Sequence, residues 1–282
     1  MDQTNSVSSG RPSPAEAWRI VGGSVRGTSH VDSGTPCQDA CEFAILRAGD
    51  DAVAAIVTAD GAGSSAHSDE GAELACAALL GEVSDYLDGY ELSAIDSQVV
   101  EEWFVRVHQA VTERAAELNV QVRELACTLL LGVVGMNRAV CAQIGDGAIV
   151  VNDATAEGGY APVTWPQSGE YANQTFFATD QEALRHLQIA LLEDRRIDEI
   201  ALFSDGLEKL ALNMGTRSAH GPFFESLFRQ LRPLSRGATA NIEGQFRAFL
   251  DSPAVNARTD DDKTLVLATR RHGASLLPVS NQ

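Results

Sequence analysis

Short apolar runs that end in an Asp-Gly pair are the main pattern of this chain. The clearest is V-A-A-I-V-T-A-D-G-A-G at 53–63, where a strand-like run stops at Asp60 and a glycine turn follows. The pattern returns as A-L-F-S-D-G at 201–206 and, more weakly, as A-Q-I-G-D-G at 142–147. In T-D-D-D-K-T-L-V-L-A, at 259–268, the acids precede the apolar run. We therefore expect four strand ends to gather carboxylates at one edge of a sheet, where oxygen ligands suit Mg²⁺ or Mn²⁺.

The other periodic segments predict strands grouped between helix pairs, which is typical of the α+β class. Strands are expected at 18–25, 39–46 and 264–269, and a hairpin of strands at 126–135 and 139–151 carries Asp146. Helices are expected at 64–87, at 96–118 and, as a pair, within 222–250. Loops are expected at 26–38 and 164–180. One folded domain over 15–273 follows, between a disordered tail at 1–14 and a polar tail at 274–282.

Composition and charge narrow the classes of partner. The 282 residues carry a formal net charge of −18, which argues against a nucleic-acid surface and an anionic membrane surface. The chain has no apolar run of membrane-spanning length and no secretory signal at its N-terminus. Its five cysteines form no C-x-x-C pair, as expected in a reducing compartment. We therefore expect a cytoplasmic protein.

Two cysteines flank an acid in a way that allows two interpretations. In an extended chain Cys37, Asp39 and Cys41 share one face of the strand. A thiolate metal site is one interpretation, but no His or Cys pair elsewhere completes a tetrahedral set. The stronger interpretation is two small side chains beside a functional Asp39.

The order of the motifs carries more information than any one of them. Q-D-A at 38–40, D-G-A-G at 60–63 and S-D-E-G-A at 68–72 come first, followed by C-T-L-L-L, I-G-D-G, L-F-S-D-G and D-D-K-T. Over roughly residues 18–270 this succession resembles the metal-dependent (type 2C) Ser/Thr protein phosphatase family. It is most similar to the bacterial branch, with G-T-S-H before Q-D-A and S-G-E-Y-A-N-Q-T at 168–175.

The resemblance implies a four-layer α-β-β-α sandwich, in which helices flank two antiparallel sheets and a pair of Mg²⁺ or Mn²⁺ ions sits at one end. Asp60 matches the carboxylate that bridges both ions, and Gly61 matches the residue whose carbonyl binds one of them. Asp205 and Asp261 match carboxylates that hold the other ion. Asp39 matches an acid that binds metal or its waters, and Asp146 matches one that helps to hold a loosely bound third ion.

The chain departs from the family pattern at three positions. Gln38 stands where Glu is frequent, and an amide can orient a metal-bound water but cannot take its proton. Gly34 stands where an Arg commonly contacts the substrate phosphate, so Arg26 or His30 is the expected substitute. Ala62 stands where some members have a His that donates a proton. Phosphate anchoring and protonation of the leaving group are therefore the open parts of the site.

The implied activity is hydrolysis of phosphoserine or phosphothreonine in a protein, by a water that two cations activate for in-line attack. Asp60 and Asp39 are the expected catalytic acids. The partner is a phosphoprotein made by a Ser/Thr kinase in a signalling system, and Tyr171 and Asn173 are expected to contact it. One alternative is a regulator or binding protein that keeps the fold with little turnover. The other is a hydrolase of small phosphate esters.

Overall fold

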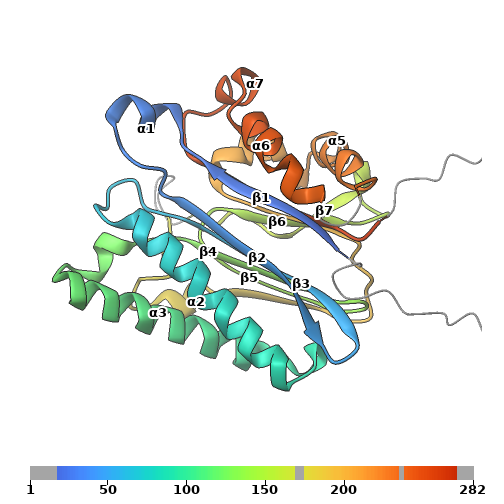
Figure 1. The fold of residues 1–282 in the computed structure, drawn as a ribbon, viewed down its shortest axis with the longest axis horizontal. Helices are drawn as coiled ribbons and strands as arrows, with labels where there is room; N and C mark the ends of the chain where they lie inside the picture. Colours follow the sequence, from blue (N-terminus) through green and yellow to red (C-terminus); the bar gives the residue numbers. More distant parts are fainter. Residues whose placement is uncertain (1–17, 169–174, 235–237, 272–282) are drawn as a thin grey trace, which may run out of the picture.

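Two antiparallel sheets of five strands each lie face to face and are covered by helices on their outer sides (Figure 1). The computed structural model of the chain describes residues 18–168, 175–234 and 238–271. The first sheet has the order β1 (Arg19–Val25), β12 (Lys263–Thr269), β9 (Glu199–Phe203), β6 (Ala148–Asn152) and β7 (Tyr160–Thr164). The second has the order β2 (Asp39–Ala48), β3 (Asp51–Asp60), β4 (Leu129–Val134), β5 (Ala139–Ile144) and β8 (Gln188–Leu192).

The two outer layers are helical. Helices α2 (Ser68–Gly89) and α3 (Ser97–Leu118) cover the second sheet, and α5 (Gly221–Leu231) and α6 (Ala238–Leu250) cover the first (Figure 1). The shorter elements are α1 (Thr28–Ser33), α4 (Glu208–Ala211), α7 (Pro253–Asn256), the hairpin β10 (Leu212–Asn213) and β11 (Ser218–Ala219), and the 3₁₀ turns Leu92–Ala94, Val122–Leu125, Glu157–Gly159, Ala183–His186 and Asp205–Leu207. The four-layer prediction is therefore confirmed.

Helix α3 shows how the sequence pattern produces an outer layer. The Asp96 side chain accepts a hydrogen bond from the Val99 amide at 3.0 Å, which caps the first turn. The helix ends at Leu118, and the next residue, Asn119, adopts the left-handed conformation with φ of 56°. Its buried stripe consists of Val100, Trp103, Phe104, Val107, Val111 and Ala115. Helical spacing over 96–118 thus predicted both the element and its buried face.

Apolar side chains fill three layers between the four layers of backbone. Side chains such as Ile56 and Leu130 of the second sheet meet Ile200 and Val266 of the first. Separate clusters fill the space under α2 and α3 and the space under α5 and α6. Burial of each large aliphatic side chain contributes roughly 1.5–3 kcal/mol. The loops at the sheet ends are thereby attached to a rigid frame.

Sequence patterning alone misplaced two segments. The run 139–151 is two strands rather than one, because β5 belongs to the second sheet and β6 to the first. The chain crosses between the sheets at Gly145, whose φ of 116° an L side chain rarely adopts. Segment 26–38 is not only loop, since Thr28–Ser33 forms the short helix α1. That helix buries no residue, so it has no apolar pattern from which to predict it.

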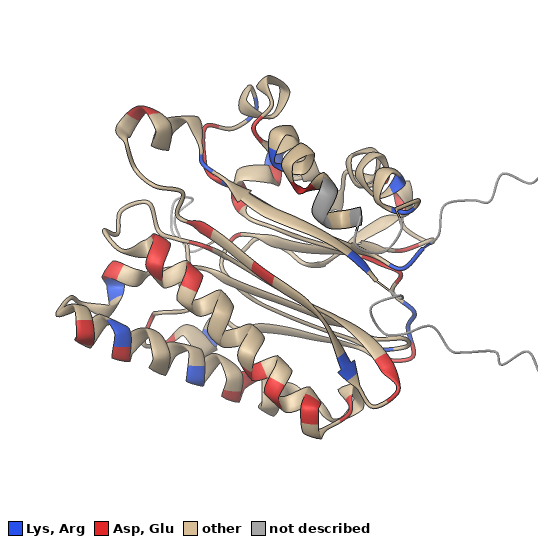
Figure 2. Ribbon diagram, viewed as in Figure 1, with Lys and Arg blue, Asp and Glu red and all other residues tan. Residues whose placement is uncertain are grey.

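Strand register brings the acid-bearing loops to one end of the sandwich. Asp39 lies directly opposite Asp60 across β2 and β3. In the first sheet, Val25 pairs with Lys263, and Phe203 pairs with Leu265, so the loops around 26, 204 and 262 share an end. Asp and Glu are also distributed along α2 and α3 (Figure 2), so the net charge of −18 is not confined to that end. No helix in the described part of the chain combines the length and apolarity that a membrane crossing requires.

Candidate functional site

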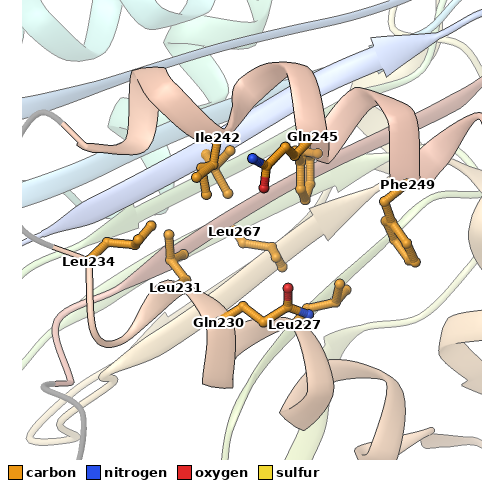
Figure 3. Close-up of a pocket in the computed structure, with 10 residues that line it drawn as sticks. Leu227, Gln230, Leu231, Leu234, Ile242, Gln245, Phe249 and Leu267 are labelled. Carbon is orange, nitrogen blue, oxygen red and sulfur yellow. The ribbon is translucent and has the colours of Figure 1, made fainter.

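The acid-bearing end of the sandwich contains a cavity of about 430 Å³. Its carboxylate residues are Asp60, Asp146, Asp205, Asp260 and Asp261. Its other lining residues are Ser29, His30, Gly61, Ala62, Gly63, Thr128, Thr175 and Phe177. A second hollow of about 270 Å³ lies between α5 and α6 and is lined by apolar side chains with Gln230 and Gln245 (Figure 3). No titratable side chain is among the residues described there, whereas five carboxylates converge on the acidic cavity, so we place the chemistry in the acidic cavity.

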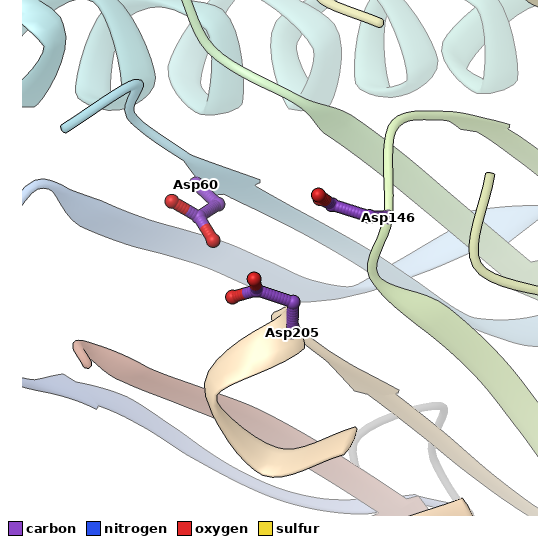
Figure 4. Close-up of side chains that lie close together, drawn as sticks. All are labelled: Asp60, Asp146 and Asp205. Carbon is purple, nitrogen blue, oxygen red and sulfur yellow. The ribbon is translucent and has the colours of Figure 1, made fainter. Parts of the chain in front are cut away.

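Three of the acids converge from three separate segments (Figure 4). Asp60 ends β3, Asp146 lies in the turn between β5 and β6, and Asp205 begins the 3₁₀ turn after β9. One carboxylate oxygen from each lies within 4.8 Å of the other two. The expected gathering of carboxylates thus holds for these strand ends.

Backbone pairing fixes Asp60 and Gly61. The Thr128 amide donates to the Asp60 carbonyl at 2.8 Å, and the Asp60 amide donates to the Thr128 hydroxyl at 2.9 Å. The Gly61 amide donates to the Gln38 carbonyl at 3.0 Å. A Cβ on Gly61 would lie 2.7 Å from the carbonyl oxygens of Gln38 and Ser68, so the chain can come this close only with glycine.

The turn that carries Asp146 is fastened by a buried amide. The Gln143 side chain donates to the carbonyls of Gly145 and Gly147 at 2.9 and 2.8 Å. The Thr175 hydroxyl donates to the Asp146 carboxylate itself. These contacts hold the acid at the cavity wall. Thr175 ends the S-G-E-Y-A-N-Q-T segment, but the sequence pattern predicted no role for it at the site.

Asp39 lies behind the triad rather than in it. It is 7% exposed, and the Ser204 hydroxyl donates to its Oδ2 at 2.7 Å. Its Oδ1 and the Oδ1 of Asp205 are buried without a hydrogen-bond partner among the described residues. Buried carboxylate oxygens without donors are costly unless a cation meets them. The donor set is all hard oxygen, so these residues fit Mg²⁺ or Mn²⁺.

The three consecutive acids at 260–262 have different environments. Asp260 and Asp261 are exposed and line the cavity. Asp262 is 3% exposed, and it accepts hydrogen bonds from the amides of Gly27 at 2.6 Å and Gln38 at 2.5 Å. Asp262 therefore joins the 26–38 segment to β12. Sequence reasoning chose Asp261 and missed the structural role of its neighbour.

Burial and mutual repulsion make these acids hard to ionise without a cation. Burial raises the pKa of Asp39 to about 7, and the negative charges of Asp262 and Asp205 add to the effect. Burial, with the charges of Asp146 and Asp261, raises the pKa of Asp205 to about 7. The pKa of Asp60 is raised for the same reasons, by burial first and then by Asp39 and Asp205.

Metal-free protein is expected to lose thermal stability as the pH rises from about 5 to about 8. Asp39 and Asp205, with pKa values of about 7, hold protons in the folded state that the unfolded chain releases near pH 4. The folded state therefore binds more protons over this window, and its stability falls with rising pH. Melting temperatures in chelator across the window measure this. The Asp39→Asn, Asp205→Asn double variant should show a flatter profile; an equally steep profile in both proteins would contradict the assignment.

The remaining residues that the sequence singled out lie in different surroundings, and only some of them line the cavity. His30 lines the cavity, whereas Arg26 is exposed and donates to the Thr35 carbonyl at 3.3 Å. Gln38 is 4% exposed, and its amide donates to the Ser68 hydroxyl at 2.6 Å. Tyr171 and Asn173 lie outside the described residues.

The thiolate interpretation of Cys37 and Cys41 lacks support. Burial, with the charges of Asp39 and Asp262, raises the pKa of Cys37, and burial raises that of Cys41 to about 11. In the described part of the chain, the candidate cluster of metal-binding side chains is the Asp triad.

Comparison with known proteins shows which family the chain matches. Residues 26–248 match the family profile described as Protein phosphatase 2C. The chain is 38% identical over 253 residues to serine/threonine-protein phosphatase 3 of Escherichia coli K12, covering 89% of this chain and 98% of that protein.

Solved structures resemble the fold at lower identity. PppA, described as a key regulatory component of T6SS in Pseudomonas aeruginosa, has a TM-score of 0.57 at 20% identity, over 89% of this chain and 97% of that one. Serine/threonine phosphatase Stp1 of Staphylococcus aureus has a TM-score of 0.54 at 15% identity, over 89% of this chain and 94% of that one. At these identities, the similarity to the solved structures shows the fold alone.

Proposed function

Because this chain belongs to the protein phosphatase 2C family and is a protein serine/threonine phosphatase, we propose that it works with two Mg²⁺ or Mn²⁺ ions held at the acid-lined cavity. Asp60 would bridge the two ions, and the Gly61 carbonyl would bind one of them. Asp205 and Asp261 would hold the other. Asp39 would bind metal or its waters from behind the triad, and Asp146 would help to hold a third, loosely bound ion.

The convergence of Asp60, Asp146 and Asp205 is the single observation that carries this proposal. Carboxylates within 4.8 Å of one another repel strongly unless cations lie between them. Burial makes that repulsion costlier, and the unpartnered Oδ1 atoms of Asp39 and Asp205 add two further acceptors. Two divalent cations would offset both the repulsion between the carboxylates and the cost of burying them.

The residues of this chain hold and orient the reactants. When bound, the cations supply a water of lowered pKa and neutralise charge on the phosphoryl oxygens. Asp39, fixed by Ser204, would orient that water as a hydrogen-bond acceptor. No Lys or Arg is among the described residues that line the cavity, so His30 is the proposed substrate contact from this chain's loop. Arg26, from the same loop, is the weaker of the two proposed substitutes for the missing Arg.

The substrate is proposed to be a phosphoprotein made by a Ser/Thr kinase in a signalling system. The related Escherichia coli protein is named as a serine/threonine-protein phosphatase, and the similar PppA structure is described as a regulatory component. Contacts from Tyr171 and Asn173 to the protein part of the substrate remain predictions from the sequence.

Hydrolysis of p-nitrophenyl phosphate and of a phosphothreonine peptide, each with Mn²⁺ and with chelator, tests the proposed function. We expect turnover of both substrates with the metal and at least a hundredfold loss in chelator. Turnover that survives chelator would contradict the metal mechanism. Turnover of the small ester alone would indicate a small-ester hydrolase, and no turnover under any metal would indicate a protein that binds partners without catalysis.

A further inference from the structure

One ring nitrogen of His30 faces a buried carboxylate. Helix α1 carries this His into the cavity wall, and its Nδ1 lies 3.0 Å from Oδ1 of Asp262. The His30 side chain is 17% exposed, whereas that of Asp262 is 3% exposed. Nδ1 is buried and has no hydrogen-bond partner among the described residues, so its approach to Asp262 is an ion-pair contact rather than a hydrogen bond. Because Nδ1 is buried, Nε2 is the ring nitrogen left for a molecule in the cavity that His30 lines.

Asp262 is held in place independently of His30. The amides of Gly27 and Gln38 donate to its two carboxylate oxygens at 2.6 and 2.5 Å. Helix α1, which carries His30, is joined to the same segment, because the Ser29 amide and hydroxyl donate to the Asp260 carbonyl at 2.9 and 2.7 Å. The fixed Asp262 carboxylate lies at ion-pair distance from Nδ1 and so holds the His30 ring at this side of the cavity.

Hydrolysis of phosphoserine or phosphothreonine requires a proton for the leaving oxygen. Serine and threonine leave as alkoxides, which are strong bases, and a positioned acid that protonates the leaving oxygen contributes about 10²–10⁴-fold in rate. Among the described residues that line the cavity, the ionisable side chains other than His30 are Asp carboxylates. Imidazole is the group whose ordinary pKa suits proton donation near neutral pH. Ala62 offers no such proton.

We propose that His30 donates the proton to the leaving seryl or threonyl oxygen and that Asp262 is its positioning residue, an inference that rests on the proposed phosphatase function. Water oxygen forms a new bond to phosphorus and loses one proton to solvent, while the bond from phosphorus to the leaving oxygen breaks. The electron pair of that bond stays on the leaving oxygen, which takes the proton from Nε2 of the doubly protonated ring. The products are the free alcohol and inorganic phosphate, and solvent returns a proton to His30.

Leaving groups of different basicity test this role. His30→Gln is expected to lower kcat for the phosphothreonine peptide and for phenyl phosphate by about 100-fold or more. The same change should lower kcat for p-nitrophenyl phosphate only a few-fold, because that leaving group needs little protonation, and KM should change little. Asp262→Asn should produce the same split to a smaller degree. His220→Gln, at an exposed His that does not line the cavity, is the matched control.

The thermal shift caused by Mg²⁺ gives a readout that does not depend on activity, and it should be the same in wild type and His30→Gln. An equal loss of kcat on all three substrates, or a rise in KM alone, would overturn the proton-donor role and leave His30 as a phosphate contact. If the wild type is active and His30→Gln has unchanged kinetics, only the proton-donor role of His30 is overturned. If the wild type hydrolyses none of the substrates, the proposed phosphatase function is overturned.

Discussion

Replacing Asp60 with Asn is expected to lower turnover of a phosphothreonine peptide by about 1,000-fold or more while leaving the fold intact. The amide removes the negative charge that we propose is shared by both cations, so neither ion would be held in its place. Asp60 ends a strand and is paired to Thr128 through its backbone, which the substitution leaves unchanged. Steady-state hydrolysis with saturating Mn²⁺ measures the effect, and circular dichroism verifies the fold.

The metal-free Asp60→Asn protein should melt at or above the temperature of the metal-free wild type. At pH 8, above the pKa of about 7 of Asp39 and Asp205, these two carboxylates act on Asp60 as like charges, and the substitution removes that repulsion. A variant that kept most of its activity, or one that melted well below wild type in chelator, would contradict the role that we assign to Asp60.

Asp205→Asn is expected to lower kcat by about 100-fold or more, through loss of one cation rather than both. Asp205 has a buried Oδ1 without a partner, so its carboxylate is available to a ligand from outside the chain. Asp261→Asn should have a similar effect, and both variants should need a higher Mg²⁺ concentration for half-maximal activity. Asp85→Asn, at an exposed position of α2, is the matched control. An unchanged Mg²⁺ requirement in both variants would contradict their assignment as ligands.

Sequence patterning predicted the outer helices because each has one buried stripe, and it predicted most strands because each is a short apolar run, buried at every position in β4, β9 and β12. It merged β5 with β6, since every position in these two strands is buried and a continuous apolar run has no internal boundary. Only Gly145-Asp146-Gly147 marks the place where the chain changes sheets. The strand β8 was missed because none of its residues is fully buried.

The acids of the site were predictable because each one follows or precedes an apolar strand. The side chains that fasten them were not, because hydroxyls and amides such as Ser204, Thr175 and Gln143 are common in loops and strands alike. The different environments of Asp261 and Asp262 likewise depend on the loop at 26–38, which meets β12 from more than 200 positions away. Long-range pairing of this kind leaves no local signal.

Counting bound Mn²⁺ per chain tests the central claim most directly. Electron paramagnetic resonance of free Mn²⁺, in a titration of metal-free protein at pH 8, measures how many ions each chain removes from solution. Our account predicts at least two ions for wild type, loss of tight binding in Asp60→Asn, and phosphatase activity that rises together with occupancy. Full activity with no bound ion, or equal Mn²⁺ binding by wild type and Asp60→Asn, would contradict it.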